Sequence, residues 1–326
     1  MSMCFPSGAR TDRSAQNGTG PASKGAIVLG WLSMFSSLGA CVLVLACAPR
    51  VVQIPATPDS YAFQNPQRVT IEGYDGDAME PFVSRDGKYL FFNNLNEPNV
   101  NTNLHWGERI DDLHFKYRGE LAGVNTAALE GVPSMDRDGN FYFVSNRSYD
   151  KTASTLYRGK FADGVVNSVE LVPGVSLGKP GIVNFDAEIS ADGNTLYFVE
   201  SQFSLFGNPK TARILIARRS GNSFVRDPAS AALLQAVNGD ALTYAPATSA
   251  SECELFFTRV GPQGPAIYLA RRANRTLPFE APRRLAAIKG FVEGPTLSAD
   301  EQSLYYHKKE NGHMVLYRVT RAAPKP

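Results

Sequence analysis

Residues 79–94, MEPFVSRDGKYLFFNN, contain the pattern that decides the fold. A short segment with β character leads into Asp86-Gly87, which is typical of a tight hairpin turn because glycine readily adopts positive φ. An unbroken apolar run, YLFF, follows at residues 89–92, and such a run indicates a strand that is covered on both faces. The stretch therefore predicts a hairpin buried inside a larger assembly of sheets.

The same pattern occurs four more times along the chain. The copies are GVPSMDRDGNFYFVSN at 131–146, DAEISADGNTLYFVES at 186–201, YAPATSASECELFFTR at 244–259 and EGPTLSADEQSLYYHK at 293–308. Their turn positions are 52, 54, 59 and 49 residues apart and are occupied by Asp86, Asp138, Asp192, Ser251 and Asp300. A period of this size is typical of propeller blades. We predict an all-β fold, a five-bladed β-propeller, with six blades as the alternative.

Each unit is predicted to continue with a third strand that ends in arginine. These arginines are Arg118, Arg158, Arg218, Arg271 and Arg318. A weaker outer strand follows in four units, but the fifth unit has no room for one before Pro326. Residues 67–72, QRVTIE, have strand character, and we predict that they pair beside residues 316–320. Both ends of the domain would then share one blade, which removes an open sheet edge.

The repeated pattern E-x-x-x-S-x-D-G-x-x-L-Y-F resembles the WD-repeat-like propeller repeat of the TolB type, which is common in exported bacterial proteins. The resemblance covers residues 67–320, although the Asp-Gly turn is lost at Ser251-Glu252 and altered at Asp300-Glu301. It implies the propeller fold, and TolB-type propellers are similar in serving as docking platforms. Function stays open, because propellers serve binding, scaffolding and catalysis alike.

Composition excludes several classes of protein. The 326 residues include 33 Lys and Arg against 31 Asp and Glu, so a nucleic-acid binder built on a basic face is not expected. The four cysteines have no C-x-x-C spacing, and the four histidines form no H-E-x-x-H pair. The sequence therefore predicts no metal site and no cofactor.

The first part of the chain is predicted to direct export. An uncharged apolar run at residues 25–49 follows the basic residues Arg10, Arg13 and Lys24. Cys47 in VLVLACAP resembles the lipidation site of bacterial lipoproteins, with Cys41 as the alternative. An uncleaved membrane anchor and plain secretion are the competing interpretations.

These observations divide the chain into four parts. We predict a signal peptide or anchor at 1–47, a linker at 48–66, the propeller at 67–320 and a tail at 321–326. The protein would be held at the bacterial cell envelope, in the periplasm or on the outer surface, by a lipid or an N-terminal helix.

One face of the propeller is predicted to carry the site. Loops between second and third strands share that face with the connections into each first strand. Unit one has an insertion at 93–112 with Asn94, His105 and Trp106, and unit three has a smaller one at 201–212. The same face should present the residues at the start of the first strands: Glu80, Glu130, Asp186, Glu188, Tyr244 and Glu293. These side chains either bond exposed backbone N–H groups or form a polar funnel for a cation, a sugar or a basic peptide end.

Two functions fit this arrangement. We predict a non-catalytic, monomeric domain that docks an envelope protein, peptide or glycan through Asn94, Trp106 and the residues of the channel mouth. The alternative is a five-bladed glycoside hydrolase, in which Glu80, Glu130 and Asp186 supply an acid, a base and an orienting group. Glu293-Gly294-Pro295 also resembles a short motif around the acid of some such enzymes. Carboxylates from different blades that meet at the channel would favour the enzyme.

Overall fold

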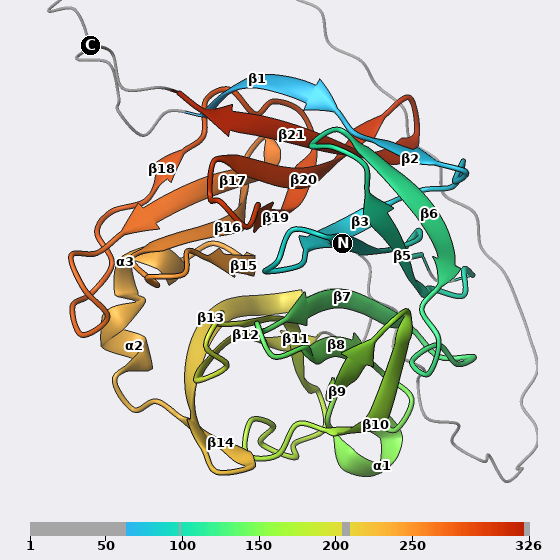
Figure 1. Ribbon diagram of the computed structural model, residues 1–326. Helices are drawn as coiled ribbons and strands as arrows, with labels where there is room; N and C mark the ends of the chain where they lie inside the picture. The colour runs from blue at the N-terminus through green and yellow to red at the C-terminus, as the bar shows by residue number, and fades with distance from the viewer. Residues whose placement is uncertain (1–62, 98, 204–208, 323–326) are drawn as a thin grey trace, which may run out of the picture. The chain divides into compact units, whose positions relative to one another are not determined.

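The computed structural model describes residues 63–97, 99–203 and 209–322, and these form five sheets arranged in a ring (Figure 1). This confirms the predicted five-bladed propeller. The predicted signal or anchor segment, Cys41 and Cys47 lie outside the described residues. Within the described ranges no helix combines the length and apolarity that crossing a bilayer requires.

The blades follow one another along the chain. Blade 1 contains β3 (Met79–Val83), β4 (Tyr89–Asn93), β5 (Leu104–Arg109), β6 (His114–Glu120) and β2 (Thr70–Glu72). Blade 2 contains β7 (Glu130–Met135), β8 (Asn140–Ser145), β9 (Leu156–Ala162) and β10 (Val165–Leu171). Blade 3 contains β11 (Ile182–Ile189), β12 (Thr195–Phe203), β13 (Pro209–Ser220) and β14 (Ser223–Arg226).

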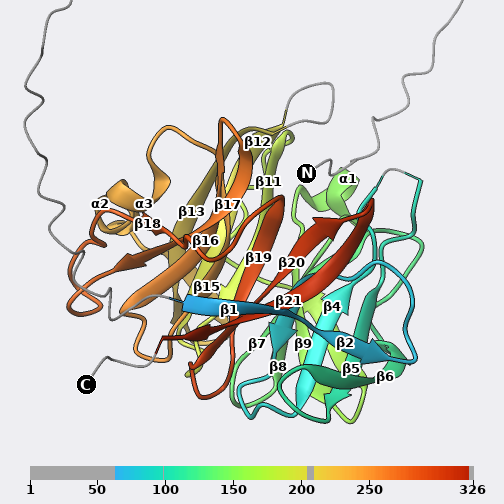
Figure 2. The ribbon, with the colours of Figure 1, turned by 90° about the horizontal axis from the view of Figure 1, so that it is seen from above.

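Blade 4 contains β15 (Thr243–Thr248), β16 (Glu254–Gly261), β17 (Gly264–Arg271) and β18 (Arg283–Arg284). Blade 5 contains β19 (Val292–Leu297), β20 (Ser303–Glu310), β21 (His313–Arg321) and β1 (Phe63–Arg68). Three one-turn helices, α1 (Tyr149–Thr152), α2 (Ser230–Leu233) and α3 (Gln235–Asn238), complete the described elements. Figure 2 shows the sheets fanning around the axis, with β1 lying across β21.

The predicted hairpins account for the core. The glycines of the Asp-Gly turns, Gly87, Gly139 and Gly193, have φ of 73°, 80° and 71°. In the two units without Asp-Gly, Glu252 and Glu301 adopt the same left-handed conformation, with φ of 57° and 59°. The apolar runs after the turns form the second strands, whose aromatic side chains are buried between neighbouring blades. The first strands β3, β7, β11, β15 and β19 contact one another and surround the central channel.

An N-terminal strand closes the ring beside the last strand of blade 5, as predicted, but this strand is residues 63–68 and not residues 67–72. Strand β1 pairs antiparallel with β21, from Phe63 opposite Arg321 to Arg68 opposite Tyr317. Residues 70–72, which we expected in the same strand, instead pair in parallel with β6 of blade 1. The chain crosses between the blades at Val69, whose amide bonds the Leu316 carbonyl. The N-terminal strand therefore joins blades 5 and 1, and the sheet starts at Phe63, inside the predicted linker.

Two further predictions about the units need correction. The segment that ends at Arg118 is the fourth strand of blade 1, because β5 takes the third position, so Trp106 lies in a strand and not on a loop. The expected insertion at 201–212 in unit three belongs to a long hairpin, in which β12 and β13 remain paired as far as Phe203 and Pro209. Both segments are regular strands that pair with their neighbours in the sheet.

We expect Phe63→Ala to destabilise the propeller by about 3 kcal/mol, because it removes a buried aromatic side chain from the closing strand. The Phe63 ring contacts Phe256 edge to face at 5.6 Å and lies under the Arg321 guanidinium at 4.9 Å. Urea unfolding measures the loss. A free energy of unfolding within 0.5 kcal/mol of the wild-type value, about the scatter of surface substitutions, would show that β1 does not close the ring.

Candidate functional site at the central channel

A β-bulge interrupts every first strand at the same height in the channel. In each blade the register shifts across two residues, and the first of them has positive φ: Glu80, Val132, Asp186, Ala245 and Gly294, with φ between 47° and 62°. Proline follows at 81, 133, 246 and 295, where the ladder needs no amide donor. A bulge redirects a side chain, and here it brings the side chains of Glu80 and Asp186 to one cavity.

The bulges also show that the predicted channel residues do not occupy the same position in each blade, as the repeat alignment had implied. Tyr244 and Glu293 precede the bulge by one residue, and Glu130 precedes it by two. Only Glu80 and Asp186 are true structural equivalents. Repeat alignment missed this because it compared the acidic residues and Tyr244, whose distance from the turn varies, whereas the bulge lies six residues before the turn position in every unit and leaves no mark in the apolar pattern.

Four of the bulge amides donate hydrogen bonds to side chains of the preceding blade. The Glu80 amide donates to His307 Nδ1 at 3.2 Å, the Val132 amide to Asn93 Oδ1 at 3.1 Å, and the Gly294 amide to Thr258 Oγ1 at 3.2 Å. Blade 3 has Val199 at the corresponding position, opposite Phe185, and there the Asp186 carboxylate itself accepts the Ala245 amide at 2.9 Å. The sequence therefore uses Asp186 where other blades use a neutral acceptor.

Asp186 has one oxygen in use and one available. Oδ2 accepts the Ala245 amide, whereas Oδ1 is buried and has no hydrogen-bond partner among the described residues. Burial raises the pKa of Asp186 to about 8; the Ala245 amide opposes this rise, and the negative charge of Glu293 adds to it. Asp186 is therefore protonated at neutral pH.

Glu293 is held in the opposite protonation state. Its Oε1 accepts the Tyr244 hydroxyl, and its Oε2 lies 3.2 Å from His307 Nε2. Because Nδ1 of His307 already accepts the Glu80 amide, the neutral ring carries its proton on Nε2 and donates it to Glu293. Burial opposes ionisation, but the bonds from His307 and Tyr244 keep the pKa of Glu293 below its ordinary 4.5.

Glu80 is the third channel carboxyl. It is 6% exposed, and a Cβ placed on Gly294 would lie 2.6 Å from its Oε2, so glycine is required there for the carboxyl to fit. Burial, followed by the charges of Asp186 and Glu293, raises the pKa of Glu80 well above 4.5. Three carboxyls from blades 1, 3 and 5 thus influence one another electrostatically.

A small cavity lies at the level of the bulges. Its volume is about 20 Å³, and it is lined by Glu80, Asp186 and Glu188 together with the prolines that follow the bulges. This volume accommodates about one water molecule. A larger molecule would have to contact the carboxyls from the face of the ring.

Glu188 and Glu130 are neutralised within the protein. Glu188 pairs with Arg85 at 2.6 Å and accepts the Ser134 hydroxyl at 2.7 Å. Glu130 accepts the backbone and hydroxyl of Thr126, the Ser145 hydroxyl and Arg147. Saturated carboxylates of this kind bond backbone and fix loops, which is the simpler of the two roles that the sequence allowed for them.

The two predicted ligand residues of unit one lie apart from the channel carboxyls. Asn94 fixes its own loop, since it donates to the Asn101 carbonyl and accepts the Asn103 amide. Trp106 packs against Tyr89 and Phe161, and a Cβ on Gly164 would lie 2.4 Å from its ring. His105 is buried against Phe92. Sequence reasoning missed His307, whose only signal was its position at the end of the second strand of unit five.

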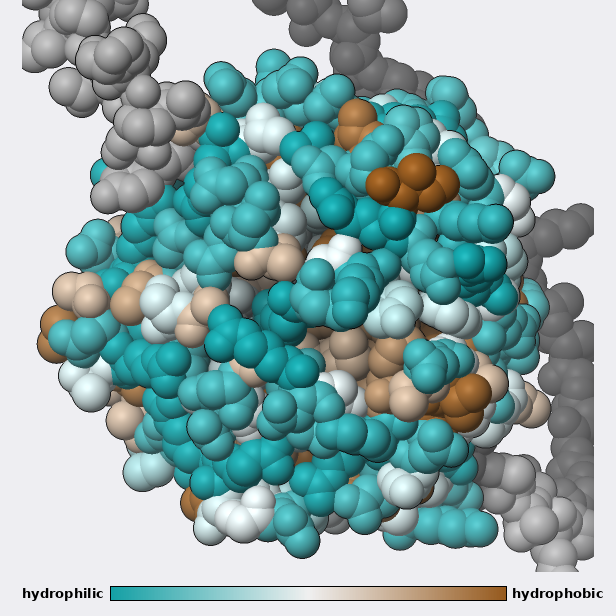
Figure 3. Space-filling model, viewed as in Figure 1, coloured by the Kyte–Doolittle hydropathy of each residue, from teal (hydrophilic) through white to brown (hydrophobic). Residues whose placement is uncertain are grey.

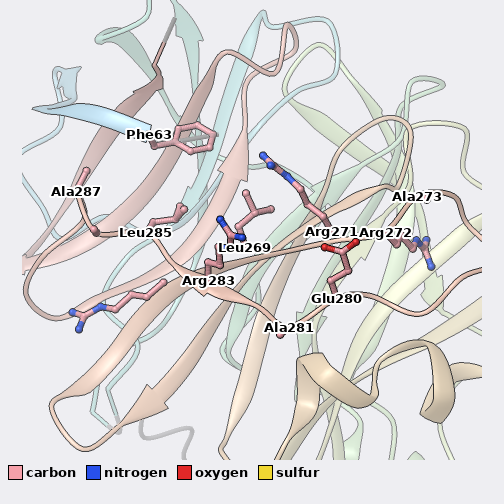
Figure 4. A pocket seen from close by; sticks show the side chains of 12 residues that line it. Phe63, Leu269, Arg271, Arg272, Ala273, Glu280, Ala281, Arg283, Leu285 and Ala287 are labelled. Carbon is pink, nitrogen blue, oxygen red and sulfur yellow. The ribbon is translucent and has the colours of Figure 1, made fainter. Parts of the chain in front are cut away.

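A larger cleft lies on the outer wall between blades 4 and 5. Figure 4 shows its lining side chains, among them Phe63, Leu269, Arg271, Glu280 and Leu285, around a volume of about 490 Å³. It contains none of the channel carboxyls. Figure 3 shows that the visible face is mostly hydrophilic, with scattered hydrophobic residues and no broad apolar area of the kind that marks many protein interfaces.

Among residues 63–97, 99–203 and 209–322, no group of three or more His, Cys, Asp or Glu side chains is placed to hold a metal ion. What the channel offers is proton chemistry, because it holds one protonated and one ionised carboxyl at a single site.

We expect Asp186→Asn to stabilise the protein increasingly as pH rises. The native pKa of Asp186 is about 8 against an ordinary 3.8, so the native state retains a proton that the unfolded chain releases between these values. Wild-type stability therefore falls across this window, by up to ~1.4 kcal/mol per pH unit, and the uncharged Asn removes that fall. Urea unfolding at pH 5 and pH 8 measures the difference. A stability gain that is equal at both pH values would refute the raised pKa.

Comparison with known proteins identifies the fold. No protein-family model matches the chain, and no curated protein does. Zg3597, a family 117 glycoside hydrolase from the marine bacterium Zobellia galactanivorans, is similar with a TM-score of 0.52 at 10% identity, over 80% of this chain and 91% of that chain. A structure described as a glycoside hydrolase has a TM-score of 0.54 at 12% identity, over 83% and 95%. TolB from Acinetobacter baumannii covers 68% of this chain and 46% of its own, with 18% identity and a TM-score of 0.39.

These findings correct one prediction. We expected a protein that is not an enzyme, yet the two structures above that share the fold over nearly their whole length are glycoside hydrolases. At 10–12% identity the likeness shows the propeller alone and assigns no residue of this chain. The choice of chemistry therefore depends on the channel geometry.

Proposed function

We propose that the protein is a glycoside hydrolase whose reaction takes place at the channel carboxyls. The observation that carries the proposal is a pair of buried carboxyls from different blades with opposite surroundings: Asp186 has an unpartnered oxygen, whereas both oxygens of Glu293 accept hydrogen bonds. These surroundings raise the pKa of Asp186 and lower that of Glu293. Glycosidic bond hydrolysis needs such a pair, one to donate a proton and one to act as an ionised base or nucleophile. The fold shared with glycoside hydrolases is consistent with this use.

Asp186 is the proposed general acid. Its unpartnered Oδ1 is available to carry the proton, because Oδ2 is occupied by the Ala245 amide. As the glycosidic C–O bond breaks, the proton moves from Asp186 to the leaving oxygen, which departs as a neutral alcohol. The burial that raises the pKa of this carboxyl is thus what makes it an acid at neutral pH.

Glu293 is the proposed ionised partner. It either attacks the anomeric carbon or accepts a proton from the attacking water, and it stabilises positive charge that develops on the sugar ring. Tyr244 and His307 each donate to one of its oxygens and thereby fix the carboxylate. His307 also accepts the Glu80 amide, so the same ring connects blade 5 to the bulge of blade 1.

A panel of aryl glycosides tests this proposal. The purified protein should release the aryl alcohol from at least one pentoside or hexoside, and Glu293→Gln should lose that activity. Glu130→Gln serves as a matched control, because Glu130 bonds only loop and strand groups in the described structure. Absence of release across α- and β-linked pentosides and hexosides would refute the hydrolase.

We also propose that the protein acts in the bacterial cell envelope, attached through Cys47 or an N-terminal helix, where its partner would be a glycan. Support comes from the basic, apolar and small residues that precede position 48. Mass spectrometry of the protein from membranes should show a lipidated Cys47, and Cys47→Ala should release the protein from the membrane fraction.

A further inference from the structure

The proposed hydrolysis leaves Glu80 without a role. This carboxyl lies beside the cavity, yet the described residues give it neither an ion pair with Lys or Arg nor the hydrogen bonds that hold Glu293. Burial, followed by the negative charge of Glu293 and by that of Asp186 when it ionises, makes ionisation of Glu80 unfavourable. Burial favours the neutral form of this carboxyl, and a cationic ligand group would favour its ionised form.

Two other acidic residues of the first strands are each paired with an arginine of the protein. Glu188 lines the same cavity but is paired with Arg85, and Glu130 is paired with Arg147. Among the cavity-lining residues there is no Lys or Arg to face Glu80 and Asp186. Among the described residues, the groups that face Glu80 are two carboxyls, the ring of His307 and the hydroxyl of Tyr244.

A second observation also points to a ligand. Asp186 is 1% exposed, lines the cavity and has no partner for Oδ1 among the described residues. The cavity has the volume of about one water molecule, and a primary ammonium group is of similar size with three donors. The lack of a metal-ligating cluster in the described chain favours an organic cation over a metal ion.

We propose that Glu80 binds the protonated amine of the substrate, so that the preferred substrates are glycosides of amino sugars with a free amine. This rests on the proposed hydrolase activity. When the ammonium group enters, Glu80 ionises and releases its proton to solvent, while Asp186 keeps the proton that it donates to the leaving oxygen. A carboxylate or sulfate on the sugar would instead face three acidic side chains without a cation, so uronides and sulfated sugars are excluded.

Calorimetry tests the amine site without reference to catalysis. Glucosamine, glucose and glucuronate are titrated into the full protein at pH 6 in two buffers of different ionisation enthalpy. We expect glucosamine to bind at least tenfold more tightly than glucose, with close to one proton released per ligand, and glucuronate to bind most weakly. Equal binding of glucose and glucosamine, or binding without proton release, would overturn the proposal.

Variants and substrates separate this proposal from the proposed function. In Glu80→Gln the tenfold preference for glucosamine and the proton release should both disappear, whereas Glu72→Gln, an exposed substitution on β2, should keep them. Aryl 2-amino-2-deoxyglycosides should be hydrolysed with at least tenfold higher kcat/KM than the matching neutral glycosides. Hydrolysis without that preference would overturn the amine site and leave the hydrolase intact. Amine binding without any hydrolysis would refute the hydrolase and, with it, the substrate assignment.

Discussion

Asp186→Asn is expected to lower kcat/KM for alkyl glycosides by about 10³-fold, because a general acid contributes ~10²–10⁴ to the rate when the leaving group needs a proton. The asparagine oxygen can still accept the Ala245 amide, so the bulge of blade 3 should keep its conformation. What the variant lacks is the proton on the unpartnered oxygen. The loss therefore reports on acid catalysis and not on folding.

The effect of Asp186→Asn on the rate should depend on whether the leaving group needs a proton. A 2,4-dinitrophenolate departs without protonation, so Asp186→Asn should reduce hydrolysis of dinitrophenyl glycosides by less than about tenfold. Glu293→Gln should impair both substrate classes alike, because its charge is needed at the anomeric carbon whatever the leaving group. Steady-state kinetics on matched alkyl and dinitrophenyl glycosides measure both effects. If Asp186→Asn lost the same factor on both substrates, Asp186 would not be the acid.

Glu252→Ala is expected to destabilise the propeller by about 3–5 kcal/mol, the range for removing one partner of a buried ion pair. Glu252 is fully buried between blades 3 and 4, where it accepts the Tyr197 hydroxyl at 2.9 Å and lies 3.8 Å from Arg272. The Arg272 side chain has no exposure and lies 4.3 Å above the Phe279 ring. Removing the carboxylate would leave this guanidinium buried without its anionic partner.

Glycine at position 252 separates the ion pair of Glu252 from the cost of its left-handed backbone conformation. Its φ of 57° favours glycine, so Glu252→Gly should be less destabilising than Glu252→Ala by about 1 kcal/mol, although both lose the ion pair. Urea unfolding of the two variants measures this order. If Glu252→Ala were within 1 kcal/mol of wild type, the buried Glu252, which accepts the Tyr197 hydroxyl of blade 3, would not hold blades 3 and 4 together.

Glu252 also shows what repeat analysis can and cannot predict. The loss of Asp-Gly in unit four looked like a degraded turn, yet the turn keeps its left-handed residue and uses the new side chain to connect blades. Hairpins, blade number and ring closure followed from local patterns of turn residues and apolar strands. Contacts between blades depend on register across sheets, which the spacing of a single repeat does not contain.

For the candidate site, the position of the residues was predictable from the sequence, whereas their protonation was not. Glu80, Asp186, Tyr244 and Glu293 were expected at the channel because first strands line it. The structure places Glu80 and Asp186 at the channel cavity, whereas Tyr244 and Glu293 lie on the first strands β15 and β19, where they bond each other. Their different protonation was not predictable, because it arises from the bulges and from His307, which approaches from the second strand. Trp106 was misplaced because β5 was read as part of a loop, and a single tryptophan gives no information about strand pairing.

The pH dependence of kcat/KM for the best aryl glycoside tests the central claim most directly. The reaction needs Asp186 protonated, so the rate should fall as pH rises through about 8, and it needs Glu293 ionised, so the rate should fall on the acid side only below pH 4.5. The account predicts a bell-shaped profile between these limits, with the alkaline limb shifted or lost in Asp186→Asn. A profile that stays flat through pH 8, or an alkaline limb unchanged in that variant, would contradict it.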